Sequence, residues 1–241
     1  MMAVRRRVGI LGGMGPEATV LLMQRVIERT EVADDQDHVP MLVDNNPQVP
    51  SRVKALVEGT GEDPGPVLAA MARGLEAGGA EALAMPCNTA HHYAPAIREA
   101  ASIPFIDMIE AASDRLAETG AQRVGVLASP AVRLTGLYDA PLAARGMTPV
   151  HPDADAALLL AMRDVKVRRH GAARDALAGI ATGLAVRGAD ALLVACTEFS
   201  IVAEPARNML PLVDAIDVLA EKVVAFSCEP AKIVQGLARN A

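Results

Sequence analysis

Short apolar runs alternate along the chain with longer stretches whose apolar residues recur at helical spacing. The short runs predict buried strands, and the longer amphipathic stretches predict helices. The predicted strands are 8–11, 41–43, 82–85, 124–127 and 191–194. The predicted helices include 16–30, 65–77, 108–119 and 172–186, and a turn-rich loop is predicted over 59–66. Strands that alternate with helices favour parallel sheets covered on both faces.

The two halves of the chain repeat one pattern. Residues 72–89 read ARGLEAGGAEALAMPCNT, and residues 181–198 read ATGLAVRGADALLVACTE. Aligned without gaps, these segments match at eight positions, among them Cys87 and Cys196, with an offset of 196 − 87 = 109. Flanking matches follow in the same order: RVGIL echoes RVGVL, and IPFID echoes LPLVD. The repeat therefore predicts two lobes of the same α/β fold.

Each cysteine of the repeat follows the carboxyl end of the same predicted strand. Ligands of open α/β sheets bind outside these strand ends. We therefore expect two pseudo-twofold-related lobes, each a mostly parallel sheet flanked by helices, with the active site in the cleft between them. The first lobe is predicted to comprise residues 1–105 plus 212–241, and the second lobe residues 106–211. That the two thiols face each other across this cleft is a hypothesis.

Two facing thiols suit the inversion of a carbon acid, which needs a proton acceptor on one face and a donor on the other. A modest lowering of the pKa of one thiol gives a thiolate, while the other thiol supplies the proton. Short polar side chains and backbone N–H groups after each cysteine, at Asn88-Thr89 and Thr197-Glu198, suit a carboxylate and the charge that develops on it.

Composition excludes several other classes. The chain has 241 residues, a net charge of −6, no Trp, two Tyr and three Phe, so neither the basic patch nor the stacking aromatics of a nucleic-acid binder are present. The acidic balance argues against an anionic membrane surface, and the apolar runs are too short for a membrane helix or a secretory core. Three cysteines without a CxxC motif favour a cytoplasmic, reducing environment.

The segments MPCNTAH, ACTE and GILGGMGPEAT together resemble the cofactor-independent aspartate/glutamate racemase superfamily, most closely its aspartate racemase branch. The resemblance runs from Val8 to about Ala225. It implies that Cys87 and Cys196 are the catalytic acid/bases of an isomerase that interconverts L- and D-aspartate. It also implies a homodimer and neither pyridoxal phosphate nor a metal.

The resemblance also implies the residues that bind the substrate. The segment NNPQVPSR at 45–52 is similar to the substrate loop of the branch, whose arginine grips a carboxylate and corresponds to Arg52. The lysine of the branch corresponds to Lys166. Two departures, Ser51 before the arginine and a longer spacing from Lys166 to Gly171, affect the choice of substrate. The other implied substrate contacts are Gln48, Asn88, Thr89, Ala90, Thr197 and Glu198.

Several alternatives remain open at this stage. Glutamate or another amino acid could be the substrate, and a single cysteine could serve another isomerase or a decarboxylase. The cysteines could be buried hydrophobes, or the cleft could bind a ligand without chemistry. Cys87 and His91, four residues apart, could join Cys196 around zinc. GMGPEA at 13–18 fits a weak nucleotide-binding pattern, although Pro16 lacks an N–H and Glu17 would repel a phosphate. His91 and His92 are interpreted as packing groups, and Cys228 as incidental.

Overall fold

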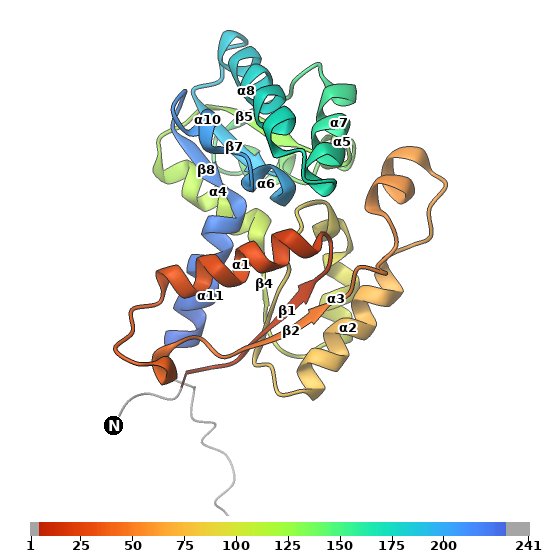
Figure 1. Ribbon diagram of the computed structural model, residues 1–241, viewed down its shortest axis with the longest axis vertical. Coiled ribbons are helices and arrows are strands. Elements are labelled where there is room, and N and C mark those ends of the chain that lie inside the picture. The colour runs from red at the N-terminus through yellow and green to blue at the C-terminus, as the bar shows by residue number, and fades with distance from the viewer. Residues whose placement is uncertain (1–4, 230–241) are drawn as a thin grey trace, which may run out of the picture.

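The protein is represented by a computed structural model, which describes residues 5–229, and it contains two parallel four-stranded sheets (Figure 1). The strand order is β2-β1-β3-β4 in the first sheet and β6-β5-β7-β8 in the second. The first sheet consists of β1 (Val8–Gly12), β2 (Met41–Asn45), β3 (Ala82–Ala84) and β4 (Phe105–Ile106). The second consists of β5 (Arg123–Ala128), β6 (Thr148–Val150), β7 (Ala191–Ala195) and β8 (Leu212–Asp214). The same order in both sheets confirms the predicted fold class.

Helices connect and cover these strands. Those that begin before β5 or after β8 are α1 (Pro16–Arg29), α2 (Gly65–Ala77), α3 (Ala94–Ala100), α4 (Met108–Glu118) and α11 (Ala215–Cys228). Those between β5 and β8 are α5 (Pro130–Leu134), α6 (Asp139–Ala143), α7 (Asp155–Lys166), α8 (His170–Val186), α9 (Thr197–Ser200) and α10 (Glu204–Arg207). Short helical segments are η1 (Asp35–Asp37), η2 (Lys54–Glu58) and η3 (Thr89–Tyr93). Within residues 5–229, no helix combines the length and apolar character that crossing a membrane requires.

The predicted strands and helices are confirmed to within two residues at each end. Several elements have no counterpart among the predicted ranges, among them the strands β4, β6 and β8 and the helices α7 and α11. Pro149 lies inside β6, and a proline is tolerated there because β6 is the edge strand of its sheet.

Alternation along β1 divides the apolar side chains of the first lobe between two cores. Val8 and Ile10 pack with α1, α4 and α11, whereas Leu11 packs with α2. The first of these cores continues into the second lobe, where it includes Val124 and Val126 of β5. A third core lies between the second sheet, α7 and α8. The lobes therefore share one continuous core through α4 and α11, and each has a further core of its own.

A glycine occupies the same place in the first strand of each lobe. A Cβ atom on Gly9 would lie 2.9 Å from the Ala80 Cβ, and one on Gly125 would lie 3.1 Å from the Ala189 Cβ. The strand and the Gly-Ala turn after the helix thus approach too closely for a side chain. This contact explains why the repeat keeps both the strand glycine and the turn alanine.

The lobe boundaries remain predictions. Strand pairing extends the first sheet through Ile106 and places residues 212–214 in the second sheet. The chain therefore passes between the lobes close to the edge strands β4 and β8. Helix α11 packs against α1 and α4, as Figure 1 shows for α1. Residues 1–4 and 230–241 of the predicted first lobe lie outside the described residues.

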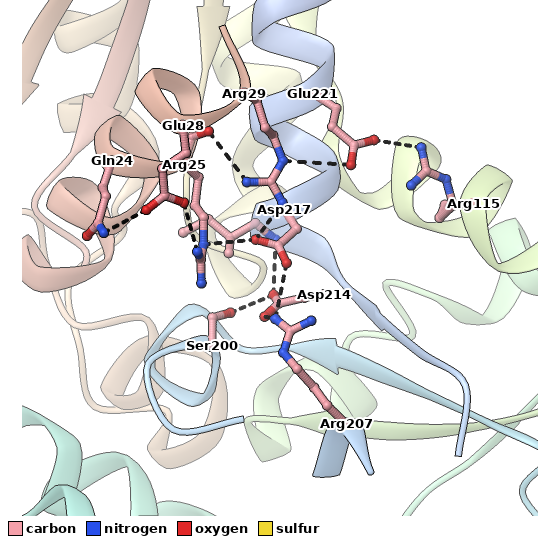
Figure 2. A network of polar contacts seen from close by, with 11 residues as sticks. Gln24, Arg25, Glu28, Arg29, Arg115, Ser200, Arg207, Asp214, Asp217 and Glu221 are labelled. Atoms are coloured by element: carbon pink, nitrogen blue, oxygen red, sulfur yellow. Dashed lines mark hydrogen bonds and ion pairs between the residues drawn. The ribbon is translucent and has the colours of Figure 1, made fainter. Parts of the chain in front are cut away.

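An ion-pair network ties the lobes together on the side of α11 (Figure 2). Asp217 of α11 accepts contacts from Arg25 at 3.1 Å and Arg29 at 3.2 Å, both on α1, and from Arg207 of α10 at 3.1 Å. Glu221, one turn further along α11, pairs with Arg115 of α4 at 2.6 Å. Because several charges share partners, the network has more weight than isolated surface pairs, which contribute about 0–1 kcal/mol each.

Asp214 is the buried member of this network. It caps α11 by accepting the Ile216 N–H, and it also accepts the Ser200 hydroxyl at 2.7 Å and pairs with Arg207 at 3.2 Å. Burial raises the pKa of the Asp214 carboxyl to about 6, and the nearby Asp217 carboxylate adds to this rise. Removal from water thus outweighs the favourable contacts of the ionised form.

We predict that Asp214 makes the stability depend on pH. An unfolded aspartate has a pKa of about 3.9, so between about pH 4 and pH 6 the folded protein holds a proton that the unfolded chain has lost. The free energy of unfolding contributed by Asp214 should therefore fall by up to about 3 kcal/mol as the pH rises through this window. Urea unfolding from pH 4 to pH 7 gives the free energy of unfolding of the wild type minus that of Asp214→Asn, and this value should fall as the pH rises. A value that rises with pH would contradict the prediction.

Candidate active site

Each repeat cysteine lies where the chain leaves its strand. Cys196 follows β7 directly and occupies the N-cap position of α9. Cys87 lies three residues after the end of β3 and shortly before η3, and the next helix begins only at Ala94, with Pro95 in its first turn. Cys87 is 7% exposed and Cys196 is 5% exposed. Both thiols are therefore buried at the carboxyl ends of equivalent strands.

The two cysteines line the same cavity, which we call the thiol cavity. Its volume is about 30 Å³. Its wall is formed by Met14, Ser51, Arg52, Val53, Cys87, Asn88, Thr89, Met162, Lys166, Cys196, Thr197 and Glu198. This volume holds about two water molecules and is too small for an amino acid. The predicted site residues other than Gln48 and Ala90 are thus brought together at this cavity, which would have to widen to admit an amino acid.

A larger space of about 910 Å³, the outer cleft, adjoins the thiol cavity. It is bordered by the loop 13–18, by residues 45–52 and by the end of α7. The residues that line both spaces are Ser51, Arg52, Lys166 and Glu198. These four residues form the wall that separates the thiols from the outer cleft. Gln48 lines the outer cleft and not the thiol cavity.

Arg52 is the positive charge beside Cys87. Burial raises the pKa of the Cys87 thiol, and the Glu198 carboxylate adds to this rise, while the Arg52 guanidinium and the Ala90 N–H act in the opposite direction. The guanidinium is held by the loop carbonyls of Val49 and Pro50, to which Nη1 donates at 3.1 and 2.7 Å. The loop thus fixes the arginine where it offsets part of the cost of a thiolate at Cys87.

Glu198 gives Cys196 the opposite environment. The Cys196 thiol donates to Oε2 of Glu198 at 3.3 Å. Burial raises the pKa of Cys196 well above the usual thiol value, and the Glu198 carboxylate raises it further, although the N–H groups of Phe199 and Glu198 counteract this in part. The pKa of both thiols is thus raised, so the expected lowering of one thiol pKa is not found, because burial outweighs the neighbouring donors. The rise is larger at Cys196, and the thiolate is therefore less unfavourable at Cys87 than at Cys196.

Polar side chains next to the cysteines link the lobes. The Thr197 hydroxyl donates to the Pro86 carbonyl at 3.1 Å, and the Tyr138 hydroxyl donates to Oδ1 of Asn88 at 2.6 Å. The hydroxyls of Thr89 and Ser129 lie 2.9 Å apart. Because these side chains are buried, an unmade contact would cost about 1–3 kcal/mol. The bonds hold both cysteine segments at a fixed separation.

Asn88 has one polar group left over. Its Nδ2 atom is buried and has no hydrogen-bond partner, although Oδ1 is satisfied by Tyr138. An unpaired buried donor is unfavourable unless a ligand or water accepts from it. Since Asn88 lines the thiol cavity, this amide is a donor available to a bound molecule.

Lys166 lies at the mouth of the thiol cavity. Its Nζ is 3.6 Å from Oε1 of Glu198, and its side chain is 52% exposed. It ends α7, and Arg168 beyond it adopts a positive φ of 60° where the chain turns into α8. The end of α7 therefore places a flexible cation between the outer cleft and the thiols.

The repeat also duplicates a supporting network to which the sequence patterns gave no role. At the offset of 109, His91 corresponds to Ser200 (91 + 109) and Arg98 to Arg207 (98 + 109). Asp107, like Asp214, caps the next helix and pairs with the repeat arginine. The matches IPFID and LPLVD contained both aspartates, so the repeat could have identified them. Ser129 and Tyr138 lie outside the repeat and gave no such signal.

The hydrogen bonds of His91 argue against the zinc alternative. Its Nδ1–H donates to the Cys87 carbonyl at 2.8 Å, and its Nε2 accepts the Met108 N–H at 3.2 Å. Both ring nitrogens are thus occupied, and burial lowers the pKa of the imidazole. The described residues contain no group of three potential metal ligands. His91 therefore orients the Cys87 turn against the start of α4.

The loop 13–18 approaches the loop 45–52 closely. Gly13 has a φ of +92°, and a Cβ there would lie 2.3 Å from the backbone of Asn46. Its N–H donates to the hydroxyl of Thr19 at 2.9 Å. Glu17, in the first turn of α1, lies 3.6 Å from the His170 ring. The glycine thus serves close packing of two loops at the outer cleft, and an acidic side chain stands where a phosphate would bind.

Two like α/β lobes that present one buried thiol each to a shared cavity define a class of pseudo-symmetric isomerases. Residues 11–223 match the model of the Asp/Glu/Hydantoin racemase family, and the chain belongs to this family. Its members include racemases, so the protein is placed among isomerases that act on amino acids.

Three relatives illustrate the match. The chain is 25% identical over 232 residues to the broad specificity amino-acid racemase RacX of Bacillus subtilis (strain 168), covering 90% of this chain and 96% of the relative. The Picrophilus torridus aspartate racemase superimposes with a TM-score of 0.84 at 29% identity, covering 92% and 94%. The glutamate racemase of Francisella tularensis subsp. tularensis SCHU S4, solved with D-glutamate, gives 0.63 at 16% identity, covering 92% and 80%, and supports the fold alone.

We predict that the two buried thiols differ in reactivity. In a Cys228→Ser background, which removes the exposed cysteine, iodoacetamide at pH 8.5 should modify Cys87 before Cys196. Both line the same cavity, so the difference reflects the larger thiolate fraction beside Arg52. Peptide mass mapping over time measures the order, and the urea-unfolded protein, in which both should react alike, is the control. Earlier modification of Cys196 would contradict the assigned charges.

Proposed function

We propose that the protein interconverts L- and D-aspartate without a cofactor by a two-thiol mechanism. The observation that supports this most directly is the position of Cys87 and Cys196, which come from different lobes and line one cavity. An α-carbon held between the two sulfurs would lose its proton to one and receive a proton from the other on the opposite face.

The unequal environments of the thiols give each a starting role. With Arg52 beside it, Cys87 is the thiol that loses its proton more readily, and as a thiolate it removes the proton of one enantiomer. Cys196, hydrogen-bonded to Glu198, starts protonated and donates to the other face. After this turnover the protonation states are exchanged, and the enzyme is ready for the opposite enantiomer. The cost of a buried thiolate at Cys87 is thus offset in part by the neighbouring Arg52.

The α-carboxylate needs donors that stabilise the enolate-like charge formed when the proton leaves. The Asn88 amide is the best placed of these, since its buried Nδ2 lacks a partner and faces the thiol cavity. The Thr89 and Thr197 hydroxyls also line the cavity. Donors that are fixed before the substrate arrives require little reorganisation when charge develops. The predicted Ala90 contact consists of an N–H that already serves the Cys87 sulfur.

The distal carboxylate of aspartate would be held at the wall between the two spaces. Arg52 and Lys166 are the cations there, and both line the thiol cavity and the outer cleft. Binding requires the cavity to widen, and a second carboxylate can replace Glu198 as the partner of Lys166. A dicarboxylate would therefore give Lys166 a new ion pair in place of the one with Glu198 that its entry breaks.

Three finer points remain predictions: the substrate, the homodimer and the cytoplasmic location. A relative named as a broad specificity amino-acid racemase and another named as an aspartate racemase support amino-acid racemisation, and glutamate is the alternative substrate. The arrangement of two cations around a small cavity favours the shorter dicarboxylate. The homodimer and the cytoplasmic location are expectations from the sequence.

The first prediction tests the paired thiols. Cys87→Ala and Cys196→Ala should each lower aspartate racemisation by at least about 10²-fold, because removing a positioned acid or base typically costs 10²–10⁴-fold. Cys228→Ala, which removes the cysteine outside the cavity, should keep wild-type turnover. Polarimetry together with α-hydrogen exchange in deuterated water measures both enantiomers. Full turnover by either cavity variant would rule out the two-thiol mechanism.

The second prediction tests the anchor for the distal carboxylate. Lys166→Met should lower kcat/KM for aspartate by about 10–100-fold, the value of one charged hydrogen bond, and leave any turnover of alanine unchanged. Arg163→Met, an exposed cation on the same helix, is the matched control. An equal loss for aspartate and alanine would show that the lysine does not recognise the side chain of the substrate.

A further inference from the structure

We propose that Glu198 is the proton-exchange residue for Cys196, through which this thiol, unlike Cys87, equilibrates its proton with solvent between turnovers. The inference rests on the proposed two-thiol function and deepens it. The resemblance implies a substrate contact for Glu198, whereas its position suits a proton path.

The carboxylate of Glu198 lies between the thiol and the outer cleft. Oε2 accepts from Cys196 Sγ at 3.3 Å, while Oε1 lies 3.6 Å from Nζ of Lys166. Glu198 is 8% exposed and lines both the thiol cavity and the outer cleft. One side chain thus contacts the buried sulfur on one side and a water-filled cleft, through a half-exposed lysine, on the other.

No carboxylate is hydrogen-bonded to the Cys87 sulfur among residues 5–229, and Glu198 bonds to the sulfur of Cys196 instead. The Glu198 carboxylate raises the pKa of Cys87 through its charge, while the Arg52 guanidinium and the Ala90 N–H lower it. A guanidinium does not give up its proton in proteins, and a backbone amide does not exchange on the time scale of turnover. The repeat position of Glu198 in the first lobe is Thr89, 198 − 109, whose hydroxyl is occupied by Ser129. The duplicated scaffold therefore provides a directly hydrogen-bonded carboxylate for Cys196 and none for Cys87.

The exchange step is a simple proton transfer. The S–H bond of Cys196 breaks, its proton moves to the Glu198 carboxylate, and the thiolate keeps the electron pair. The neutral carboxyl then releases this proton to water in the outer cleft, and the reverse sequence brings a solvent proton to the thiolate. Lys166 stabilises the ionised carboxylate that begins and ends the cycle. Atoms and charge balance with water as the sole co-reactant.

Isotope transfer distinguishes the two thiols. One enantiomer is always formed by protonation from Cys196, and the other by protonation from Cys87. In deuterated water, a Cys196 that equilibrates with solvent delivers deuterium at every turnover. A Cys87 that does not exchange returns the hydrogen that it removed from an earlier substrate molecule. Deuterium should therefore enter the two enantiomers of a racemic substrate at unequal rates.

The experiment uses racemic α-protonated aspartate with the wild-type protein in deuterated water, followed by chiral separation and mass spectrometry at low conversion. We expect deuterium to enter one enantiomer at least about tenfold faster than the other. Glu198→Gln keeps the size and hydrogen bonding of the side chain but cannot carry the proton, so it should make both rates slow and equal. Glu198→Asp should restore part of the difference, and Glu204→Gln, an exposed carboxylate of the same lobe, should retain all of it.

Equal rates in the wild type, or a difference that persists in Glu198→Gln, would overturn the inference while racemisation itself stands. The wild-type comparison decides the matter even if the glutamine variant does not fold. Absence of both inversion and deuterium uptake in the wild type would instead refute the two-thiol function, and the inference with it. The isotope ratio would not respond to a purely structural role of Glu198, since such a role alters both directions alike.

Discussion

Two sulfur atoms from separate lobes must face a cavity that holds little more than two water molecules, and the rest of the structure depends on this constraint. A shift of one lobe would separate the thiols or close the space. Two separate sets of contacts therefore join the lobes. On the cavity side, buried hydrogen bonds such as that from Thr197 to the Pro86 carbonyl link the cysteine segments directly. On the far side, the lobes share one apolar core and the ion pairs of α11.

The scaffold is symmetric where position matters and asymmetric where charge matters. Both lobes share the strand order, the glycine in the first strand and a capping aspartate paired with an arginine. Around the sulfurs the lobes differ, because Arg52 reaches Cys87 and Glu198 reaches Cys196. Identical surroundings would favour the same protonation state in both thiols. A reaction that needs one donor and one acceptor requires the lobes to differ at these two residues.

The sequence predicted the fold well because the repeat and the periodicity are local patterns. Strand and helix positions, the two lobes and the shared location of the cysteines follow from segments of a few residues each. Contacts made by residues outside the repeat could not be predicted in this way: Tyr138 on Asn88 and Ser129 on Thr89 depend on how the lobes dock. Neither could the small volume of the cavity, which depends on the rotamers of Arg52 and Lys166. Strand β6 escaped prediction because Pro149 interrupts its pattern.

The closed cavity and the firmly joined lobes together indicate how the site must open. Separation of the lobes would break the shared core and the α11 ion pairs at once, at a cost comparable to the whole stability of a domain. The wall towards the outer cleft is far easier to move. Arg52 is bound there by two carbonyls of its own loop, and Lys166 by one ion pair at 3.6 Å with a half-exposed side chain. Widening the cavity would therefore disturb the fewest contacts at the 45–52 loop and at the end of α7. The cations that would bind the substrate move with this wall, while the thiols stay fixed.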